Sequence, residues 1–185
     1  VITGPGASSL IISGNNGNGS RNFSVFNIAS GGNLSISGIT VSGAKTTDNG
    51  AGLNNLGNLA VSNSLISGNS GGNFGGGIFS SGTLSVSGST FTGNSASYGA
   101  GLYVSRNSST GTVSNSTFSG NTAFRLGGGL FNNGTLTITN TTVSGNTSID
   151  AQYGAGLHSN ATVNIANTII ANSTSGGDFS GNQPV

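Results

Sequence analysis

The chain has 185 residues, of which 4% are charged, and its Lys+Arg 4 against Asp+Glu 3 give a formal net charge of +1. This charge balance excludes the basic field that nucleic acid needs and a polybasic membrane patch. The lack of Cys excludes disulfides and thiolate metal sites, and no apolar run approaches the ~20 residues of a membrane-spanning helix. We therefore expect no nucleic-acid partner and no membrane insertion.

The N-terminal elements are the least regular. Residues 12–15 are predicted to be the last strand of an early coil. Residues 23–28 then begin the next coil, and residues 34–36 and 39–41 complete it, because apolar and small polar residues alternate in them.

Further along, one pattern recurs about every 25 residues. Each copy opens with a glycine-rich tetrad, at residues 50–53, 75–78, 99–102, 127–130 and 154–157. An alternating apolar and polar run follows, and then one large apolar residue and a Gly-Asn step. The last of these steps reads Ala-Asn, and the Asn numbers 69, 94, 121, 146 and 172 differ by 25, 27, 25 and 26. This near-constant period is typical of stacked repeats.

Three strand-like segments per repeat, with no helical periodicity, predict an all-β fold. We expect a right-handed, single-stranded parallel β-helix (a β-solenoid) of about six coils of about 25 residues, each with three short strands. The apolar positions predict three interior columns, for example Leu53, Ile78, Leu102, Leu130 and Leu157. One domain would cover residues 1–185, with a less regular N-terminal coil at 1–22, regular coils at 23–179 and a tail at 180–185. Insertions at 105–110 and 148–153 are predicted to be loops.

Two motifs carry a family resemblance. Residues 91–94 and 118–121 are similar to the Phe-x-x-Asn repeat of chlamydial-type polymorphic outer-membrane proteins, and the tetrads resemble the Gly-Gly-Ala-Ile motif of that family. The whole chain also resembles bacterial right-handed β-helix repeat proteins of the cell surface. The resemblance implies a secreted or surface-displayed protein, and many such proteins serve as adhesins.

The regularly spaced asparagines are interpreted as a structural ladder. Asn tolerates left-handed backbone angles, and its amide can bond to the amide of the next coil. Calcium binding is the alternative, but the repeat lacks the Asp that calcium-binding β-rolls use. The predicted ladder consists of Asn69, Asn94, Asn121, Asn146 and Asn172.

Two outward-facing columns are candidate contact surfaces. Phe79, Tyr103, Phe131 and His158 each follow an inward apolar residue, so we expect an exposed aromatic column. It would either stack to stiffen the solenoid, or be covered by a neighbouring loop, or contact a partner or a sugar. The hydroxyl face, similar to the Thr-x-Thr arrays of ice-binding solenoids, would consist of Thr40, Ser42, Thr90, Thr92, Thr117, Ser119, Thr142 and Ser144.

The acidic residues do not predict a catalytic site. Asp48 and Asp150 fall about four coils apart, on the order of 19 Å, so they cannot cooperate as paired carboxylates. Asp150 is expected to pair with Arg125, and His158 has no predictable acid beside it. We therefore predict no catalytic residues, no metal and no cofactor.

These patterns favour an extracellular or cell-surface structural or adhesive solenoid. Its ends lack a predicted capping helix, so we expect copies or adjoining solenoid segments to associate head to tail, as in a filament. A binding module that uses a flat face for glycan or ice is the alternative. A degenerate carbohydrate-active enzyme is the least favoured reading.

Overall fold

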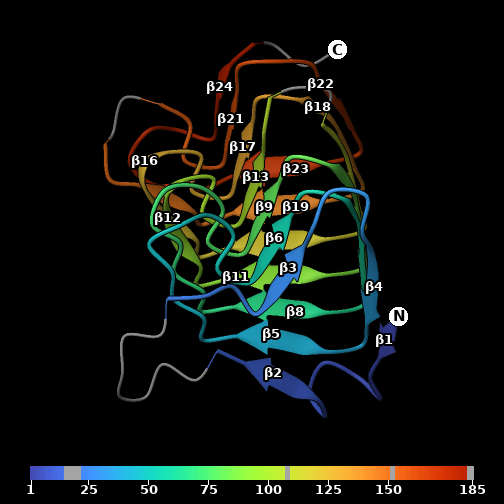
Figure 1. Ribbon diagram of the computed structural model, residues 1–185. Helices are drawn as coiled ribbons and strands as arrows, with labels where there is room; N and C mark the ends of the chain where they lie inside the picture. The colour runs from blue at the N-terminus through green and yellow to red at the C-terminus, as the bar shows by residue number, and fades with distance from the viewer. Residues whose placement is uncertain (15–21, 107–108, 151–152, 183–185) are drawn as a thin grey trace.

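The computed structural model describes residues 1–14, 22–106, 109–150 and 153–182. These residues contain 24 strands and no helix. Three parallel sheets of seven strands run the length of the molecule, and a small sheet of three strands lies beside them (Figure 1). The predicted β-solenoid is confirmed, with six full coils of three strands in the described residues and partial coils at both ends.

We call the three long sheets A, B and C. Along the chain, each coil contributes one strand to sheet C, then one to sheet A and then one to sheet B. Sheet C holds the strand after each glycine tetrad: β3 (Phe26–Ile28), β6 (Leu53–Asn55), β9 (Ile78–Ser80), β13 (Leu102–Val104), β17 (Leu130–Asn132), β21 (Leu157–Ser159) and β24 (Phe179–Gly181). Since β24 includes Ser180 and Gly181, the last coil extends into the segment that was predicted to be a tail; residues 183–185 of that tail lie outside the described residues.

Sheets A and B hold the second and third strands. Sheet A consists of β1 (Ile2–Thr3), β4 (Asn33–Ser37), β7 (Asn58–Ser62), β10 (Thr83–Ser87), β14 (Thr110–Ser114), β18 (Thr135–Thr139) and β22 (Val163–Ala166). Sheet B consists of β2 (Ile11–Ser13), β5 (Thr40–Ser42), β8 (Leu65–Ser67), β11 (Thr90–Thr92), β15 (Thr117–Ser119), β19 (Thr142–Ser144) and β23 (Ile169–Ala171).

The interior is a stack of matching apolar side chains. Leu53, Ile78 and Leu102 pair in register in sheet C, and each is fully buried. Phe91 and Phe118 stack in the same way from sheet B, with ring centroids 4.4 Å apart and an interplanar angle of 7°. Burying each such side chain contributes roughly 1.5–3 kcal/mol. A single coil buries little alone, so the core forms only when coils stack.

The small sheet was not predicted. It consists of β12 (Ser95–Tyr98), β16 (Thr122–Leu126) and β20 (Thr147–Ser148), and we call it the side sheet. It lies between the Gly-Asn step and the next glycine tetrad, and it projects from one side of the solenoid (Figure 1). The two predicted insertions contain residues 107–108 and 151–152, which lie outside the described residues.

Candidate functional site

The asparagine ladder runs inside the solenoid. The backbone N–H of Asn69 donates to Oδ1 of Asn94 at 3.1 Å, and Asn94 donates in the same way to Asn121, also at 3.1 Å. The Nδ2 atom of each of these residues also donates to the same oxygen, and to a backbone carbonyl of the preceding coil. These buried amides are therefore used by coil-to-coil bonds, which confirms the structural interpretation for Asn69, Asn94, Asn121 and Asn146.

The prediction that Asn172 belongs to the ladder is wrong. Ile170 pairs with Val143 and Ala171 pairs with Ser144, so Asn172 takes the place of Gly145. Its φ of 59° matches the 62° of Gly145, and its side chain is exposed. Ser173 therefore occupies the ladder position, and its backbone N–H donates to Oδ1 of Asp178 at 2.7 Å.

Two further internal ladders were not predicted. One is made of hydroxyls at the turn between sheets A and B: Ser64 N–H donates to Oγ of Ser89 at 3.2 Å, and Ser89 N–H donates to Oγ of Ser116 at 3.2 Å. In the other, Nδ2 of Asn55 donates to Oγ of Ser80 at 3.0 Å, and Asn132 repeats this bond to Ser159. The recurring triplets 87–89, 114–116 and 139–141, each a hydroxyl residue on either side of Gly or Asn, carry the signal for the first ladder.

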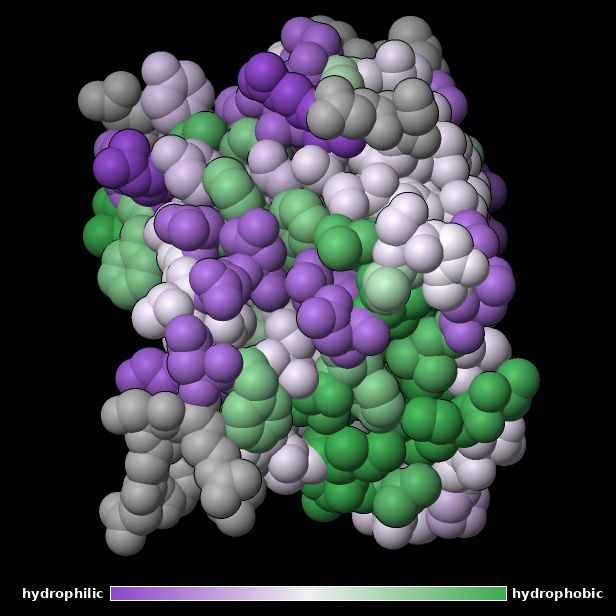
Figure 2. All heavy atoms as spheres, viewed as in Figure 1, coloured by the Kyte–Doolittle hydropathy of each residue, from purple (hydrophilic) through white to green (hydrophobic). Residues whose placement is uncertain are grey.

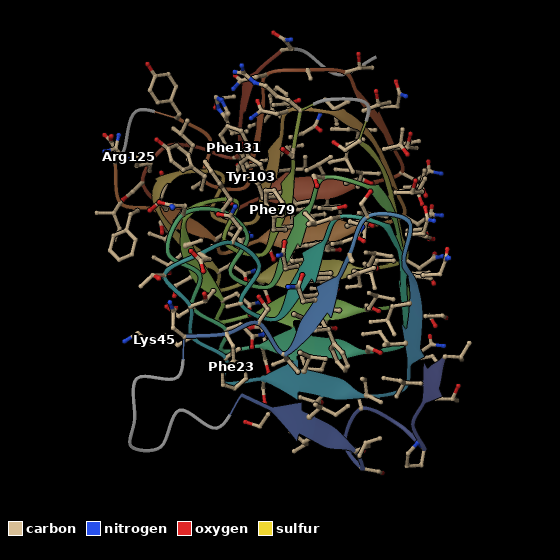
Figure 3. All side chains as sticks on the ribbon, viewed as in Figure 1. Phe23, Lys45, Phe79, Tyr103, Arg125 and Phe131 are labelled. Atoms are coloured by element: carbon tan, nitrogen blue, oxygen red, sulfur yellow. The ribbon has the colours of Figure 1, made fainter. Side chains whose placement is uncertain are left out.

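The aromatic column is buried, so the prediction that it is exposed is wrong. Phe79, Tyr103 and Phe131 are 8%, 6% and 4% exposed, and His158 is 6% exposed. Figure 3 shows the first three in a row along sheet C. Tyr103 stacks on Phe79 at 5.6 Å and on Phe131 at 5.0 Å between ring centroids.

The side sheet and its neighbours provide the cover. Phe74, Tyr98 and Leu126 pack against the column, and the ring centroid of Phe74 lies 4.5 Å from that of Tyr103. The predicted alternative of a covering loop therefore describes this column, which forms a second small core outside sheet C. Burial raises the pKa of Tyr103, against the smaller lowering effects of its hydrogen bond with Asn133 and of Arg106.

His158 is held by two polar side chains at the end of the column. Its Nδ1 lies 2.7 Å from Oγ of Ser180, and its Nε2 lies 2.9 Å from Oδ1 of Asn160. Burial lowers the pKa of this imidazole, and the hydrogen bond with Asn160 opposes that shift. His158 is therefore packed against Phe131, with ring centroids 4.9 Å apart, rather than facing solvent as predicted.

The predicted hydroxyl face lies on the outside of sheet B. Thr90, Thr117 and Thr142 are aligned in register and half-buried, as are the paired positions Thr92, Ser119 and Ser144. Thr40 does not belong to the exposed array, because it is 5% exposed and its hydroxyl donates to the carbonyl of Ala7 at 2.6 Å. Ser42 remains half-buried in the column of Ser13 and Ser67.

Sheet A carries a wider polar face that was not predicted. Its five-residue strands β10, β14 and β18 pair in continuous register, and the outward positions alternate with the buried core residues. The sequence does contain a signal for this face. Because side chains alternate between the two sides of a strand, the predicted inward residues fix three outward positions on each five-residue strand. These positions are Thr83, Ser85, Ser87, Thr110, Thr112, Ser114, Thr135, Thr137 and Thr139.

The ends of the long sheets expose apolar side chains. At one end Ile11 of β2 is 61% exposed, and at the other Ile169 of β23 is 62% exposed. A broad apolar surface surrounds β1 and β2 (Figure 2). Ile2 and Ile12 pack only partly against the core at that end, as Ile165 and Ile170 do at the opposite end.

Charged groups are scattered across the described residues. Within them, no three His, Asp or Glu side chains gather to hold a metal ion, and no salt bridge joins Arg125 to Asp150, so that predicted pair is not formed. Arg125 instead lies over the ring of Tyr98, 5.9 Å from its centroid. In this part of the chain no helix is long and apolar enough to cross a membrane.

Comparison with known proteins identifies no relative. No protein-family model matches the chain, and no curated protein and no solved structure matches it. The fold therefore rests on the structure itself, and the function on the surfaces described above.

Proposed function

We propose that this chain is a structural β-solenoid of the cell surface or the extracellular space that associates end to end. The observation that carries this proposal is the match between the two ends. Ile11 and Ile12 of β2 occupy the same register positions as Ile169 and Ile170 of β23, along one unbroken column of sheet B.

The inward residues at both ends are alike. Sheet A begins at Ile2 and ends at Ile165, and sheet C begins at Phe26 and ends at Phe179. All four are partly buried against the core. If the β1–β3 edges of one copy lie over the β22–β24 edges of another, each interior column continues with residues of the same kind. The edges of these strands would then pair as coils do inside the chain.

The outward residues support the same contact. Ile11 and Ile169 are the first and last residues of one outward column of sheet B. Between them, most positions of this column carry Thr, and Leu65, in β8, is the exception. A large apolar residue therefore returns at the first and last strands of the sheet. In a head-to-tail stack, Ile11 of one copy would meet Ile169 of the next and exclude water from both.

The surface location rests on composition and resemblance. Only 4% of the residues are charged, and Ser and Thr side chains line the outer face of sheet A. The Phe-x-x-Asn segments at residues 91–94 and 118–121 are similar to those of polymorphic outer-membrane proteins. We propose an adhesive or scaffolding role of the same general kind.

Sedimentation velocity over a range of protein concentrations tests end-to-end contact. We expect the wild type to form oligomers that grow with concentration, because a heterologous contact does not close. Ile11→Ser and Ile169→Ser should each weaken this growth. Leu65→Ser is the matched control, since it removes an outward apolar residue from the same column in mid-solenoid, and it should leave growth unchanged. Equal growth in all four proteins would reject the proposal.

A second candidate function is binding of a glycan or an ice surface by a flat face. The regular outward hydroxyls of sheet A favour it, since strands about 4.8 Å apart repeat them as a lattice. Thr112→Tyr would disrupt this lattice on sheet A, and Thr92→Tyr would disrupt the narrower face on sheet B. Glycan arrays and thermal hysteresis should lose signal with the first variant if sheet A binds. Absence of any signal from the wild type would reject this function.

A further inference from the structure

Two exposed apolar side chains lie next to each other on the side sheet. Phe124 of β16 is 59% exposed, and Ile149, just after β20, is 58% exposed. Neither packs into the aromatic core beneath the sheet, which is covered instead by Tyr98 and Leu126. Large apolar side chains clustered on a polar surface indicate a contact site.

The backbone fixes these residues as neighbours. The N–H of Ile149 donates to the carbonyl of Ala123 at 2.9 Å, and the N–H of Asp150 donates to the carbonyl of Phe124 at 3.1 Å. These two bonds hold residues 149–150, a bend that follows β20, beside β16. Phe124 lies beside Ile149, and Arg125 lies beside Asp150. We call these four residues the side ridge.

The two charges of the side ridge have no partner of opposite charge within the described residues. Arg125, in β16, and Asp150, just after β20, are exposed, and they form no salt bridge there. The guanidinium of Arg125 reaches back over Tyr98 at 5.9 Å from the ring centroid. Figure 3 shows Arg125 at the outer edge of the molecule, away from the long sheets. Since neither charge has an ionic partner in the described part of the chain, both can take part in an intermolecular contact.

We propose that the side ridge is a contact surface for a second copy of this chain, related by a two-fold axis. In such a contact the same patch meets itself, so residue i touches residue j and residue j touches residue i. Phe124 and Ile149 of the two copies form the apolar centre. Arg125 of each copy faces Asp150 of the other, so the single positive and the single negative charge of the ridge both find a partner.

The charge pattern favours this occupant over a foreign protein or a sugar. A ridge with one charge of each sign beside an apolar pair is complementary to itself, and its net charge is zero. The ridge is small compared with the ~1,200–2,000 Å² that stable complexes bury, so the contact between single copies is weak. It joins solenoids side by side, which differs from the end-to-end stacking proposed above and does not depend on it.

The test uses a background in which the ends are altered. With Ile11→Ser and Ile169→Ser both present, end-to-end association is weakened, so sedimentation equilibrium reports mainly side-by-side pairing. We expect a monomer–dimer equilibrium in this background. Phe124→Ser with Ile149→Ser should lower the association constant by about tenfold or more. Leu56→Ser is the control, because Leu56 is 43% exposed but lies outside the side ridge.

A charge-reversal series tests the two-fold arrangement. Arg125→Asp alone and Asp150→Arg alone each place like charges opposite one another, so each should weaken pairing. The double variant restores two opposite-charge contacts and should recover the association constant of the parent. A double variant as weak as the single variants would overturn the proposal. So would a protein that stays monomeric at every concentration, or one that binds a glycan through the ridge without pairing.

Discussion

The backbone N–H of Ser173 donates to Oδ1 of Asp178 at 2.7 Å, whereas the ladder amides from Asn69 to Asn121 each donate to an asparagine of the next coil. Asp178 thus ends the internal ladder with an acceptor that comes from only five residues further along the chain. The hydroxyl of Ser173 is buried, and it has no hydrogen-bond partner among the described residues. This end of the ladder is therefore less well satisfied than its middle.

Asp178→Ala should weaken the last coil. Removal of the carboxylate leaves the Ser173 amide without its acceptor, which costs about 1–2 kcal/mol. Asp178→Asn keeps an acceptor oxygen and should retain most of that stability. Hydrogen exchange at the Ser173 amide is the direct measurement. Exchange that is faster in Asp178→Ala but not in Asp178→Asn would support the role of Asp178 as the acceptor at the end of the ladder. Unchanged exchange in both variants would refute it.

Asn94→Ala should destabilise the whole solenoid. It removes the acceptor of the Asn69 amide and the bonds that its own Nδ2 makes to Asn121 and Ile66. Buried groups left unpaired cost about 1–3 kcal/mol each, so we expect a loss of about 3 kcal/mol in the free energy of unfolding. Asn58→Ala is the control, because Asn58 is exposed on sheet A and should change stability by less than about 0.5 kcal/mol. Urea denaturation distinguishes the two; equal losses would contradict a special role for the ladder.

Two glycines should respond to alanine in different ways. A Cβ on Gly101 would lie 2.5 Å from the carbonyl oxygen of Gly129, beside the ladder residue Asn121, so coils would have to separate. A Cβ on Gly68 meets nothing within 4 Å, and only its φ of 62° opposes the substitution. Gly68→Ala should cost about 1 kcal/mol and Gly101→Ala clearly more, as thermal denaturation would report. The reverse order would show that coil spacing does not depend on Gly101.

Stability should fall with acid because of His158. Burial lowers the pKa of His158 in the folded protein below its ordinary value of 6.5. The unfolded chain then binds a proton at pH values where the folded chain does not, so lower pH favours unfolding. This stability is fully present above pH 6.5 and is lost as pH falls toward the lowered pKa.

The pH effect is measured by urea denaturation between pH 7.5 and pH 5. His158→Gln should flatten the dependence in that range, because it removes the one histidine of the sequence, the side chain whose charge ordinarily changes between about pH 5 and 8. A slope that survives in His158→Gln would assign the effect to other groups.

The interior of the solenoid could be predicted from sequence because its period is strict. Leu53, Ile78 and Leu102 recur at one position of each repeat, and parallel pairing allows only one register that buries all of them. The same argument places Asn69, Asn94, Asn121 and Asn146 at one corner. Each coil repeats the constraint, so small irregularities do not disturb it.

Asn172 shows where the motif misleads. The Ala-Asn pair resembles the Gly-Asn step, but register is set by the strand, in which Ile170 lies beside Val143. Both Gly and Asn adopt left-handed backbone angles, so Asn172 fills the glycine position without strain. Counting from the apolar residue of each repeat, rather than from the Asn, gives the correct alignment.

The burial of Tyr103 could not be predicted from alternation alone. Alternation correctly places Tyr103 outside sheet C, but a second layer covers it. That layer contains Tyr98 and Leu126, whose strands are short and irregular, with a register shift between Ala96 and Tyr98. Each side-sheet strand is a short segment between the Gly-Asn step and the next glycine tetrad. Its alternation of apolar and polar residues is too weak to predict that it covers the outer side of sheet C.

Electron microscopy of the purified protein at rising concentration tests end-to-end association most directly. The match of Ile11 with Ile169 predicts rods that lengthen with concentration while their width stays that of one solenoid, or of two where side ridges pair. Uniform single particles of one solenoid's length at the highest concentration would contradict the proposed function.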